Sequence, residues 1–432
     1  MMRSGQSGEK AADELFYPAL FLFLAGFLLH CFLAARSWVG GDQIYLLNLG
    51  LDFANHGNLH PLGKWRMGAG TNPGVLLQLL IGVPLALWHN FHAPMVAVLL
   101  SHLVSGILVA GMFRSVLGSP GLFFATVAYW LSPWRLYNGG ILWEPAFIFL
   151  PAAAHLWACH RLRNQASFWP SAVLFLSLFS AAQIHNSSFI LFLVTAFLAG
   201  KRKIRIHWAG AGAGMATAGV TLIPAVITLL RGNLPPSIHS EGFLGAGFVM
   251  VYPTLKGILY WFTLGALDVV RQLEESVFRH SEGVVGVRML QGLSVASVGL
   301  SILASWRLVR HSGRQGDGED ELGWLKSYAI STFAALVLSA ALSPVVLQGW
   351  MVVVALPGAC IPVVLYASKL WRSQPRRTSW AVAAYVTFEI TLALVMGLGD
   401  PIFRRTESLP PNVDPHGELA PIIPHQSIGA PL

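Results

Sequence analysis

Charged residues are scarce in this sequence. Only 11% of the 432 residues are charged and 54% are apolar, whereas charged residues make up roughly 25% of an ordinary soluble domain. A soluble protein could not bury so much apolar surface. Apolar runs of about 20 residues with few charges recur along the chain, and such runs are typical of transmembrane helices. The sequence therefore predicts an all-α polytopic integral membrane protein.

Cysteine is rarer still. Cys31, Cys159 and Cys360 are the three in the chain. Each lies within an apolar run, and none has a CxxC or Cys/His spacing. This pattern supports neither a disulfide framework nor a thiolate metal site. We expect the three side chains to pack between helices.

Basic residues outnumber acidic ones and give a formal charge of +8. Such an excess could indicate a nucleic-acid partner, but the cations form short clusters at the ends of apolar segments, which indicates membrane topology instead. The cluster at 201–205 is the strongest marker of the inner side, and the linkers at 307–326 and 369–377 agree with it. We expect a multi-pass protein of the cell inner (plasma) membrane, with a cytoplasmic N-terminus, no nucleic-acid partner and about 11 to 13 spans.

One transmembrane domain is expected to fill residues 1–399. The apolar segment 16–35 has no small-residue cleavage site after it, so we expect it to remain as the first span. Two external loops are expected, a polar one at 36–72 and a mixed one at 231–283. The Pro-rich tail at 400–432 is expected to be external and irregular.

The external loop 36–72 is rich in ionisable side chains, which are scarce elsewhere in the chain. Its ionisable side chains include Asp42, Asp52, His56, His60, Lys64 and Arg66. Apolar and polar residues alternate from Ile44 to Asn55 in a way that suits an interfacial helix lying on the membrane. This loop is the first candidate for a functional site.

Glu144 stands at the head of an apolar segment and is followed by Pro145, which suits the first turn of a helix. An acidic residue in this position is a candidate for a functional role. The alternative is a solvated N-terminal residue that complements the helix dipole.

A polar block interrupts the apolar stretch 171–199. A straight helix would put residues 183–188 near the bilayer centre, where unpaired polar groups are costly. Two short helices that meet at His185 and Asn186 avoid this cost if the break faces a water-filled cavity. The alternative is one span whose polar residues bond to neighbouring helices.

The segment 209–230 begins with a run of glycine and alanine. Gly210 and Gly214 have the Gly-xxx-Gly spacing that suits close helix packing in lipid. A phosphate-binding loop is disfavoured, because the run lacks a preceding strand and the Lys-Ser/Thr of that motif.

These motifs together resemble the GT-C membrane glycosyltransferases, and most of all the group of aminoarabinose transferases and protein O-mannosyltransferases. The resembling motifs, within about residues 16–230, are Asp42-x-x-Tyr45, Pro73 leading the second span, Ser132-Pro133, Glu144 and the break at His185-Asn186. The family usually has Asp-Glu where this chain has Asp42-Gln43. The entry to the second span matches only in part, as His60-Pro61-Leu62-Gly63-Lys64.

The resemblance implies a GT-C-like fold and a glycosyltransferase that takes a sugar from a polyprenyl-phosphate donor. Transfer would occur on the non-cytoplasmic side, to a cell-envelope lipid, glycan or protein. Asp42 is the expected catalytic residue, either as base or as the holder of a metal that lowers the pKa of the acceptor hydroxyl. The expected substrate-binding residues are Tyr45, Lys64, Arg66, Glu144, His185 and Asn186. Lys256 and Arg271 are further candidate cations for the leaving phosphate.

Other interpretations stay open. Asp42 could serve only as the cap of the interfacial helix, and Lys64 and Arg66 could serve only as interfacial anchors. The histidines of the loop and of the break lack the spacing of a metal site, so no metal ligands are predicted, and a divalent metal is left open as a cofactor. The alternative function is a transporter or flippase of lipid-linked or small solutes, or an O-antigen polymerase or ligase.

Overall fold

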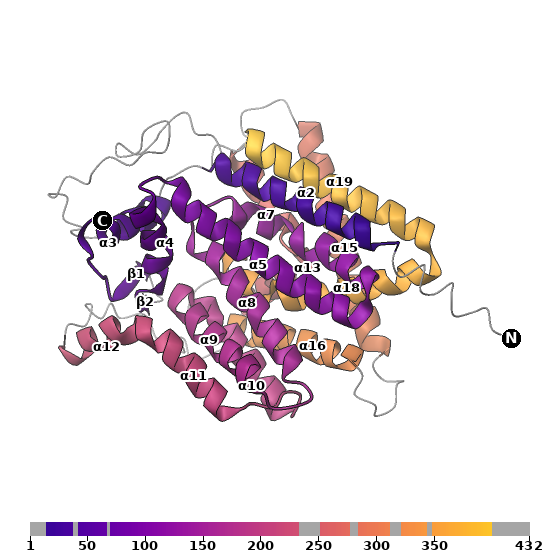
Figure 1. The fold of residues 1–432 in the computed structure, drawn as a ribbon. Helices are drawn as coiled ribbons and strands as arrows, with labels where there is room; N and C mark the ends of the chain where they lie inside the picture. Colours follow the sequence, from indigo (N-terminus) through magenta and orange to yellow (C-terminus); the bar gives the residue numbers. More distant parts are fainter. Residues whose placement is uncertain are drawn as a thin grey trace.

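The computed structural model describes residues 14–37, 42–66, 70–232, 251–276, 284–311, 321–343 and 348–399. The described chain is helical except for one hairpin, and the elements are shown in Figure 1. In the first half they are α2 (Phe16–Ala35), α3 (Asp42–His56), β1 (Leu62–Arg66), β2 (Gly70–Pro73), α4 (Leu76–Leu87), α5 (His92–Leu117), α6 (Ser119–Ala125), the π-helix η1 (Thr126–Trp130), α7 (Pro133–Gly139), α8 (Glu144–Arg161), α9 (Phe168–Ile184), the 3-10 helix η2 (Asn186–Ser188) and α10 (Phe189–Gly200). In the second half they are α11 (Trp208–Gly219), η3 (Val220–Leu222), α12 (Ile223–Leu230), α13 (Val251–Thr263), α14 (Ala266–Ser276), α15 (Val284–His311), α16 (Glu321–Ala341), α17 (Gly349–Val352), η6 (Val353–Ala355), α18 (Leu356–Ser373) and α19 (Pro375–Gly399).

Seven helices among the described residues are long and apolar enough to cross a membrane. They are α2, α5, α11 with α12, α15, α16, α17 with α18, and α19. Three more apolar helices, α4, α9 and α10, are shorter. The predicted class, a helical multi-pass membrane protein, is confirmed. The expected 11 spans counted every apolar segment once, including those that form the shorter helices, and the upper figure of 13 counted two segments as broken pairs.

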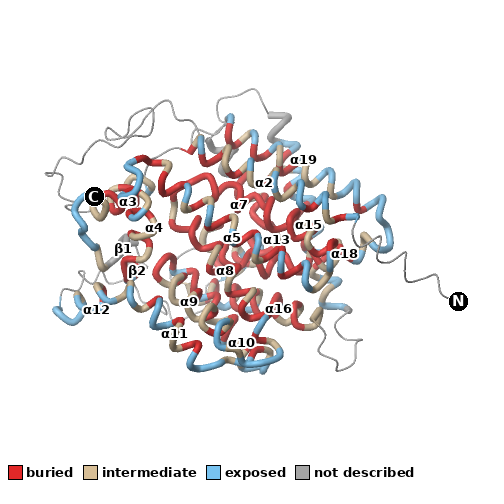
Figure 2. Tube along the Cα trace, viewed as in Figure 1, coloured by how far each residue is buried: buried red, intermediate tan, exposed pale blue. Residues whose placement is uncertain are grey.

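The outer helices turn apolar side chains away from the protein. On α2, for example, Tyr17, Phe21, Leu24 and Leu28 are exposed. In Figure 2 the buried tube lies in the middle of the bundle around α5, α7, α8 and α13, whereas α12 and much of α19 are exposed. Apolar residues on the outside are what a bilayer requires, because lipid tails are as apolar as the side chains that face them.

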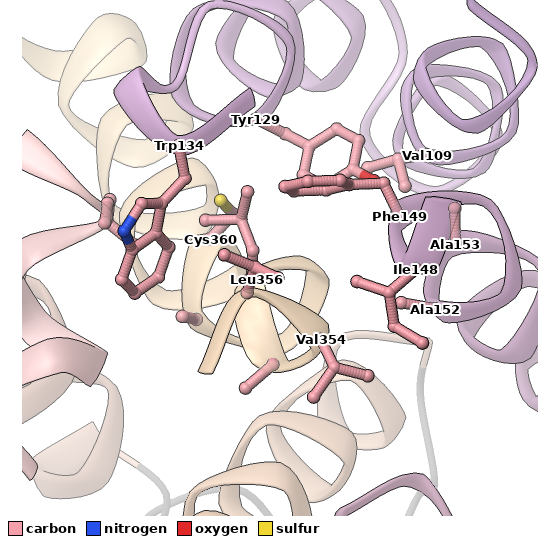
Figure 3. Close-up of a cluster of buried hydrophobic side chains, with 14 of the residues drawn as sticks. Val109, Tyr129, Trp134, Ile148, Phe149, Ala152, Ala153, Val354, Leu356 and Cys360 are labelled. Carbon is pink, nitrogen blue, oxygen red and sulfur yellow. The ribbon is translucent and has the colours of Figure 1, made fainter. Parts of the chain in front are cut away.

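The core surrounds α8, which is buried along nearly its whole length. Side chains from α5, η1, α7, α8, η6 and α18 point toward one another there (Figure 3). They include Val109, Tyr129, Trp134, Phe149, Val354 and Cys360. Without a hydrophobic driving force between helices in lipid, such packing contacts hold the bundle together.

Arg135 on α7 is fully buried in this core. Its Nη1 donates to Ser105 Oγ and its Nη2 to the His102 carbonyl oxygen, both at 2.6 Å. The guanidinium also lies 4.4 Å from the Tyr129 ring centroid and 4.8 Å from that of Trp130. These hydrogen bonds and cation–π contacts offset much of the cost of a charge within a membrane protein, although Nε of Arg135 has no hydrogen-bond partner among the described residues. They fix α7 against α5 and η1.

The basic linkers gather at one end of the bundle. Arg163, just after α8, pairs with Glu321 at the start of α16. Trp324 Nε1 donates to the carbonyl oxygen of Lys203, which follows α10. We call this the basic end. The helix α3, the hairpin and α4 lie together at the opposite end, on the left of Figure 1, which we call the α3 end.

Part of the expected mixed loop 231–283 is packed structure. Within it, α13 and α14 bury Tyr260, Trp261, Val269 and Val270 and contact α15 and α16. Residues 233–250 and 277–283 lie outside the described chain, as does the tail 400–432.

The Gly-xxx-Gly motif lies where α11 packs on α9. A Cβ added at Gly210 would lie 2.2 Å from the Phe168 carbonyl oxygen, and one at Gly214 would lie 2.2 Å from that of Ala172. Both neighbours are backbone atoms, which cannot move aside without shifting a helix. The interpretation of this motif as a close helix contact is therefore confirmed.

We expect Gly214→Ala to lower stability by about 1–3 kcal/mol, because the new methyl group overpacks the α9–α11 contact. Gly212 on the same helix is the matched control, since nothing lies within 4 Å of its added Cβ. Gly212→Ala should be neutral or stabilising by up to about 1 kcal/mol. Thermal unfolding in detergent measures both, and equal shifts for the two variants would contradict the close contact.

Candidate active site

The helix α3 is held by its apolar face. Leu46, Leu47 and Leu51 are buried, and α3 packs on α4. The approach is close, because a Cβ added at Gly50 would lie 2.6 Å from Ile81 Cγ2. Asp42, in the first turn, stays exposed. The expected interfacial helix is thus packed against the protein, and Asp42 at its start lies outside the core.

The start of α3 meets the start of α8. Trp143 Nε1 donates to Asp42 Oδ2 at 3.3 Å. Tyr45, one turn after Asp42, lies close enough to the buried Glu144 for that carboxylate to act on it. Burial, followed by the charge of Glu144, raises the pKa of Tyr45 above its ordinary value. Three residues expected at the site, Asp42, Tyr45 and Glu144, are therefore neighbours.

The expected break in the apolar stretch 171–199 is present. The helix α9 ends at Ile184, and His185 is extended, with φ −156° and ψ 139°. The His185 Nδ1 accepts a hydrogen bond from the backbone N–H of Ser187 at 3.1 Å. His185 is buried, whereas Asn186 is exposed. The helix is therefore interrupted at His185, whose side chain caps the short helix that follows, and the next residue, Asn186, is at the surface.

The hairpin in the first external loop reaches this break. Asn72 on β2 is buried, and its Nδ2 donates to the Ile184 carbonyl oxygen at 2.8 Å. Strand β1, which carries Lys64 and Arg66, pairs antiparallel with β2, and Arg66 lies opposite Gly70. The side chains of Lys64 and Arg66 lie outside the described part of the structure. Their backbone places them one strand away from the broken helix.

A short helix connects the break, α8 and α13. The helix α17 contacts η2, and the ring centroid of Trp350 on α17 lies 5.2 Å from that of Trp143. Just before α17, Gln348 Oε1 accepts a hydrogen bond from Lys256 Nζ at 3.0 Å. The residues around α17 thus lie between the Asp42–Glu144 pair and a cation of α13.

A buried carboxyl group lies under this short helix. Asp268 on α14 accepts a hydrogen bond from Trp134 Nε1 at 3.3 Å, and a Cβ added at Gly349 would lie 1.8 Å from Asp268 Oδ2. Burial raises the pKa of Asp268, although the Trp134 hydrogen bond and the charges of Arg271 and Lys256 oppose that rise. Lys256 and Arg271, the further candidate cations for the leaving phosphate, therefore lie near the Asp268 carboxyl group.

Sequence reasoning missed Trp143, Trp350 and Asp268. The sequence could have indicated a role for Trp143, because this residue directly precedes Glu144, which is a candidate site residue. Trp350 and Asp268 gave no local signal, since they reach the site only through contacts between distant parts of the chain.

Asp52 organises the far end of α3. His60 Nε2 lies 2.5 Å from Asp52 Oδ2, His56 Nδ1 lies 3.1 Å from Oδ1, and Asn58 Nδ2 donates to Oδ1 at 2.9 Å. These bonds tie the segment after α3 back to the helix. Within the described residues, no group of three or more His, Cys, Asp or Glu side chains is arranged to hold a metal ion.

Comparison with solved structures identifies proteins with a similar fold. ArnT from Cupriavidus metallidurans, bound to undecaprenyl phosphate, superposes with a TM-score of 0.51 at 13% sequence identity, over 89% of this chain and 73% of that one. The chain has the GT-C fold. The resemblance seen in the sequence is thereby confirmed at the level of fold.

A second solved structure is similar at a lower score. The oligosaccharyltransferase AglB from Archaeoglobus fulgidus, in complex with an inhibitory peptide and a dolichol-phosphate, has a TM-score of 0.45 at 12% identity. The match covers 89% of this chain and 56% of AglB. No protein-family model matches the sequence, and no curated protein matches it either.

The Asp52 cluster predicts a pH dependence of stability. Burial by itself raises the pKa of Asp52, but the hydrogen bonds from His60, Asn58 and His56 outweigh it and hold the pKa below its ordinary value. A carboxyl group whose pKa falls on folding stabilises the protein above the unfolded value of about 3.9. That stabilisation is lost as the pH falls through the lower, folded value.

We therefore expect Asp52→Asn to unfold at a lower temperature than the parent protein at pH 7, with a gap that closes at acid pH below the ordinary carboxyl range. Thermal unfolding in detergent across this range measures the gap. Asn58→Ala, which removes one of the three bonds, should give a smaller gap of the same sign. A gap that stays constant down to the lowest pH would contradict the assignment.

Proposed function

We propose that the protein is a membrane glycosyltransferase that moves a sugar from a polyprenyl-phosphate donor to a cell-envelope lipid, glycan or protein. The observation that carries the proposal is the meeting of Asp42 with the start of α8, through the hydrogen bond from Trp143, the residue before Glu144. The GT-C fold, shared with an ArnT structure that holds undecaprenyl phosphate, supports it.

Asp42 acts as the base in this proposal. The acceptor hydroxyl oxygen attacks the anomeric carbon and forms the new glycosidic bond, and its proton passes to the Asp42 carboxylate. The bond from the anomeric carbon to the phosphate oxygen breaks, and its electron pair leaves with the lipid phosphate. Asp42 suits this role because it is exposed, while the Trp143 indole N–H fixes the position of its carboxylate.

The leaving phosphate needs positive charge. Lys256 lies beside Gln348, and Arg271 lies near it on the next helix. Lys64 and Arg66 follow on β1, next to the strand that contacts the break. Cations of this kind stabilise the charge that develops on a phosphate as it departs. We assign the phosphate to Lys256 and Arg271, with Lys64 and Arg66 as further candidate cations.

The remaining polar residues are assigned to the sugar. The raised pKa of Tyr45 keeps its hydroxyl protonated and able to donate, and Glu144 can accept from sugar hydroxyls. Asn186 is exposed at the break, where His185 sets the backbone. Hydrogen bonds of this kind orient the anomeric carbon toward the attacking oxygen, and orientation contributes to the rate.

The arrangement of charge gives the proposed orientation. Basic linkers face the cytoplasm in membrane proteins, so the basic end is assigned to the cytoplasmic side. The α3 end, with Asp42 and Glu144, then faces the other side of the inner (plasma) membrane. The donor would meet its acceptor there, with its lipid tail in the bilayer.

Asp42→Asn is expected to lower the transfer rate by roughly 10²- to 10⁴-fold, because Asn cannot accept the proton. The protein should stay folded, since Asn caps a helix about as well as Asp. The measurement is mass spectrometry of surface glycolipids and glycoproteins, in cells that lack the gene and carry either version.

The parent chain should restore one sugar modification, whereas Asp42→Asn should leave the lipid-linked donor to accumulate. Asp52→Asn is the matched control and should transfer at a near-normal rate, because Asp52 lies about 15 Å along α3 from Asp42. Near-normal transfer by Asp42→Asn would contradict the catalytic assignment. Loss of transport without any change in glycans would favour a transporter.

A further inference from the structure

A cleft of about 750 Å³ opens at the basic end of the bundle. It lies between the end of α15, the start of α16 and the end of α18. Its wall includes four cations, Arg307, Lys326, Lys369 and Arg372, together with Tyr366 and Ser368. No acidic residue lines it among the described residues.

The four cations have no carboxylate partner in the part of the chain that the structure describes. The nearest acidic residue in sequence, Glu321 at the start of α16, pairs with Arg163 instead. Arg307 lies 5.5 Å from the Tyr366 ring centroid, which holds its guanidinium at the cleft. The cleft thus presents several positive charges that nothing on the described protein neutralises.

An apolar groove of about 300 Å³ continues from this cleft. The two share Ala304, Tyr366, Leu370 and Gln374. The groove runs between α15, α18 and α19, which contact one another and lie together in Figure 1. Its lining is mostly apolar and includes Leu264, Leu300, Val363, Ala367, Val382 and Tyr385, together with the polar residues Arg377 and Thr378. It therefore leads from the charged end of the bundle toward its middle.

We propose that this composite cleft binds one anionic phospholipid. The phosphate headgroup lies among the four cations and an acyl chain lies in the groove. Basic pockets between transmembrane helices at a membrane surface are suited to anionic headgroups. The apolar continuation distinguishes such a lipid from a free phosphate ion, which has no part that could occupy it.

The shape of the cleft distinguishes its cations from cations that serve only to orient a protein in the membrane. Cations that only set membrane orientation need no shared cavity, and they can anchor singly at the interface. Here they come from three helices that converge on one hollow. The site is at the opposite end from the proposed transfer reaction and does not depend on it.

The test compares lipid binding by purified full-length protein and its variants, using native mass spectrometry with added phosphatidylglycerol or phosphatidylcholine. The first variant is Arg307→Gln/Lys369→Gln/Arg372→Gln. Each cation near an anionic lipid is worth about fivefold in affinity, so the triple change should weaken phosphatidylglycerol binding roughly 100-fold. Phosphatidylcholine, which has no net charge, should bind weakly to every version.

The matched control removes three exposed cations from the same end of the bundle but outside the cleft. This variant, Lys201→Gln/Arg202→Gln/Arg205→Gln, should bind phosphatidylglycerol like the parent. Ala381→Trp, at an exposed position of the groove, should block the acyl chain and also reduce binding. If the triple variant fails to fold, Lys369→Gln alone should still weaken binding about fivefold.

Several results would overturn the proposal. Equal losses in the cleft and control variants would show only a general effect of charge. Equal binding of phosphatidylcholine would show an apolar groove without a headgroup site. Displacement of the lipid by millimolar inorganic phosphate would assign the cleft to the free ion, and exclusive retention of a polyprenyl phosphate would exclude an ordinary phospholipid.

Discussion

The buried guanidinium of Arg135 is the constraint on which the candidate active site depends. A charge inside a membrane protein is costly, and here hydrogen bonds to Ser105 and His102 and contacts with two aromatic rings offset that cost. Because these partners lie on α5 and η1, α7 has little freedom to shift. The chain then runs directly from α7 to Trp143 and Glu144.

The position of α7 in turn fixes two sets of contacts at the candidate site. On one side, Trp143 reaches Asp42 and Trp350. On the other, Trp134 donates to Asp268, which lies against Gly349 at the start of α17. Trp134 on α7 and Trp143 just before α8 therefore connect the acidic loop, the α17 region and the cations of α13 and α14. Indole N–H groups suit this task, since a buried ring can pack while its polar edge bonds.

Hydropathy was sufficient to predict most of the fold. Apolar segments, the break at His185 and the helix contact at Gly214 follow from local rules about lipid, and the structure has all three. The β1–β2 hairpin and the packing of α13 and α14 escaped prediction, because short strands and partly polar helices carry weak periodic signals. Within the site, Asp42 and Glu144 stood out as acids at segment boundaries. Asp268 did not, since its importance comes from a contact with Trp134.

The central claim is that a lipid-linked phosphate binds at the α3 end, where Asp42 and Glu144 meet. The most direct test is photocrosslinking of the purified protein with a photoactivatable polyprenyl phosphate, followed by mass spectrometry of the labelled peptides. We predict labelling of peptides that contain the start of α3, Trp143 with Glu144, and the region from Gln348 to Trp350. Labelling confined to the cleft at the basic end, with none at these three places, would contradict the account.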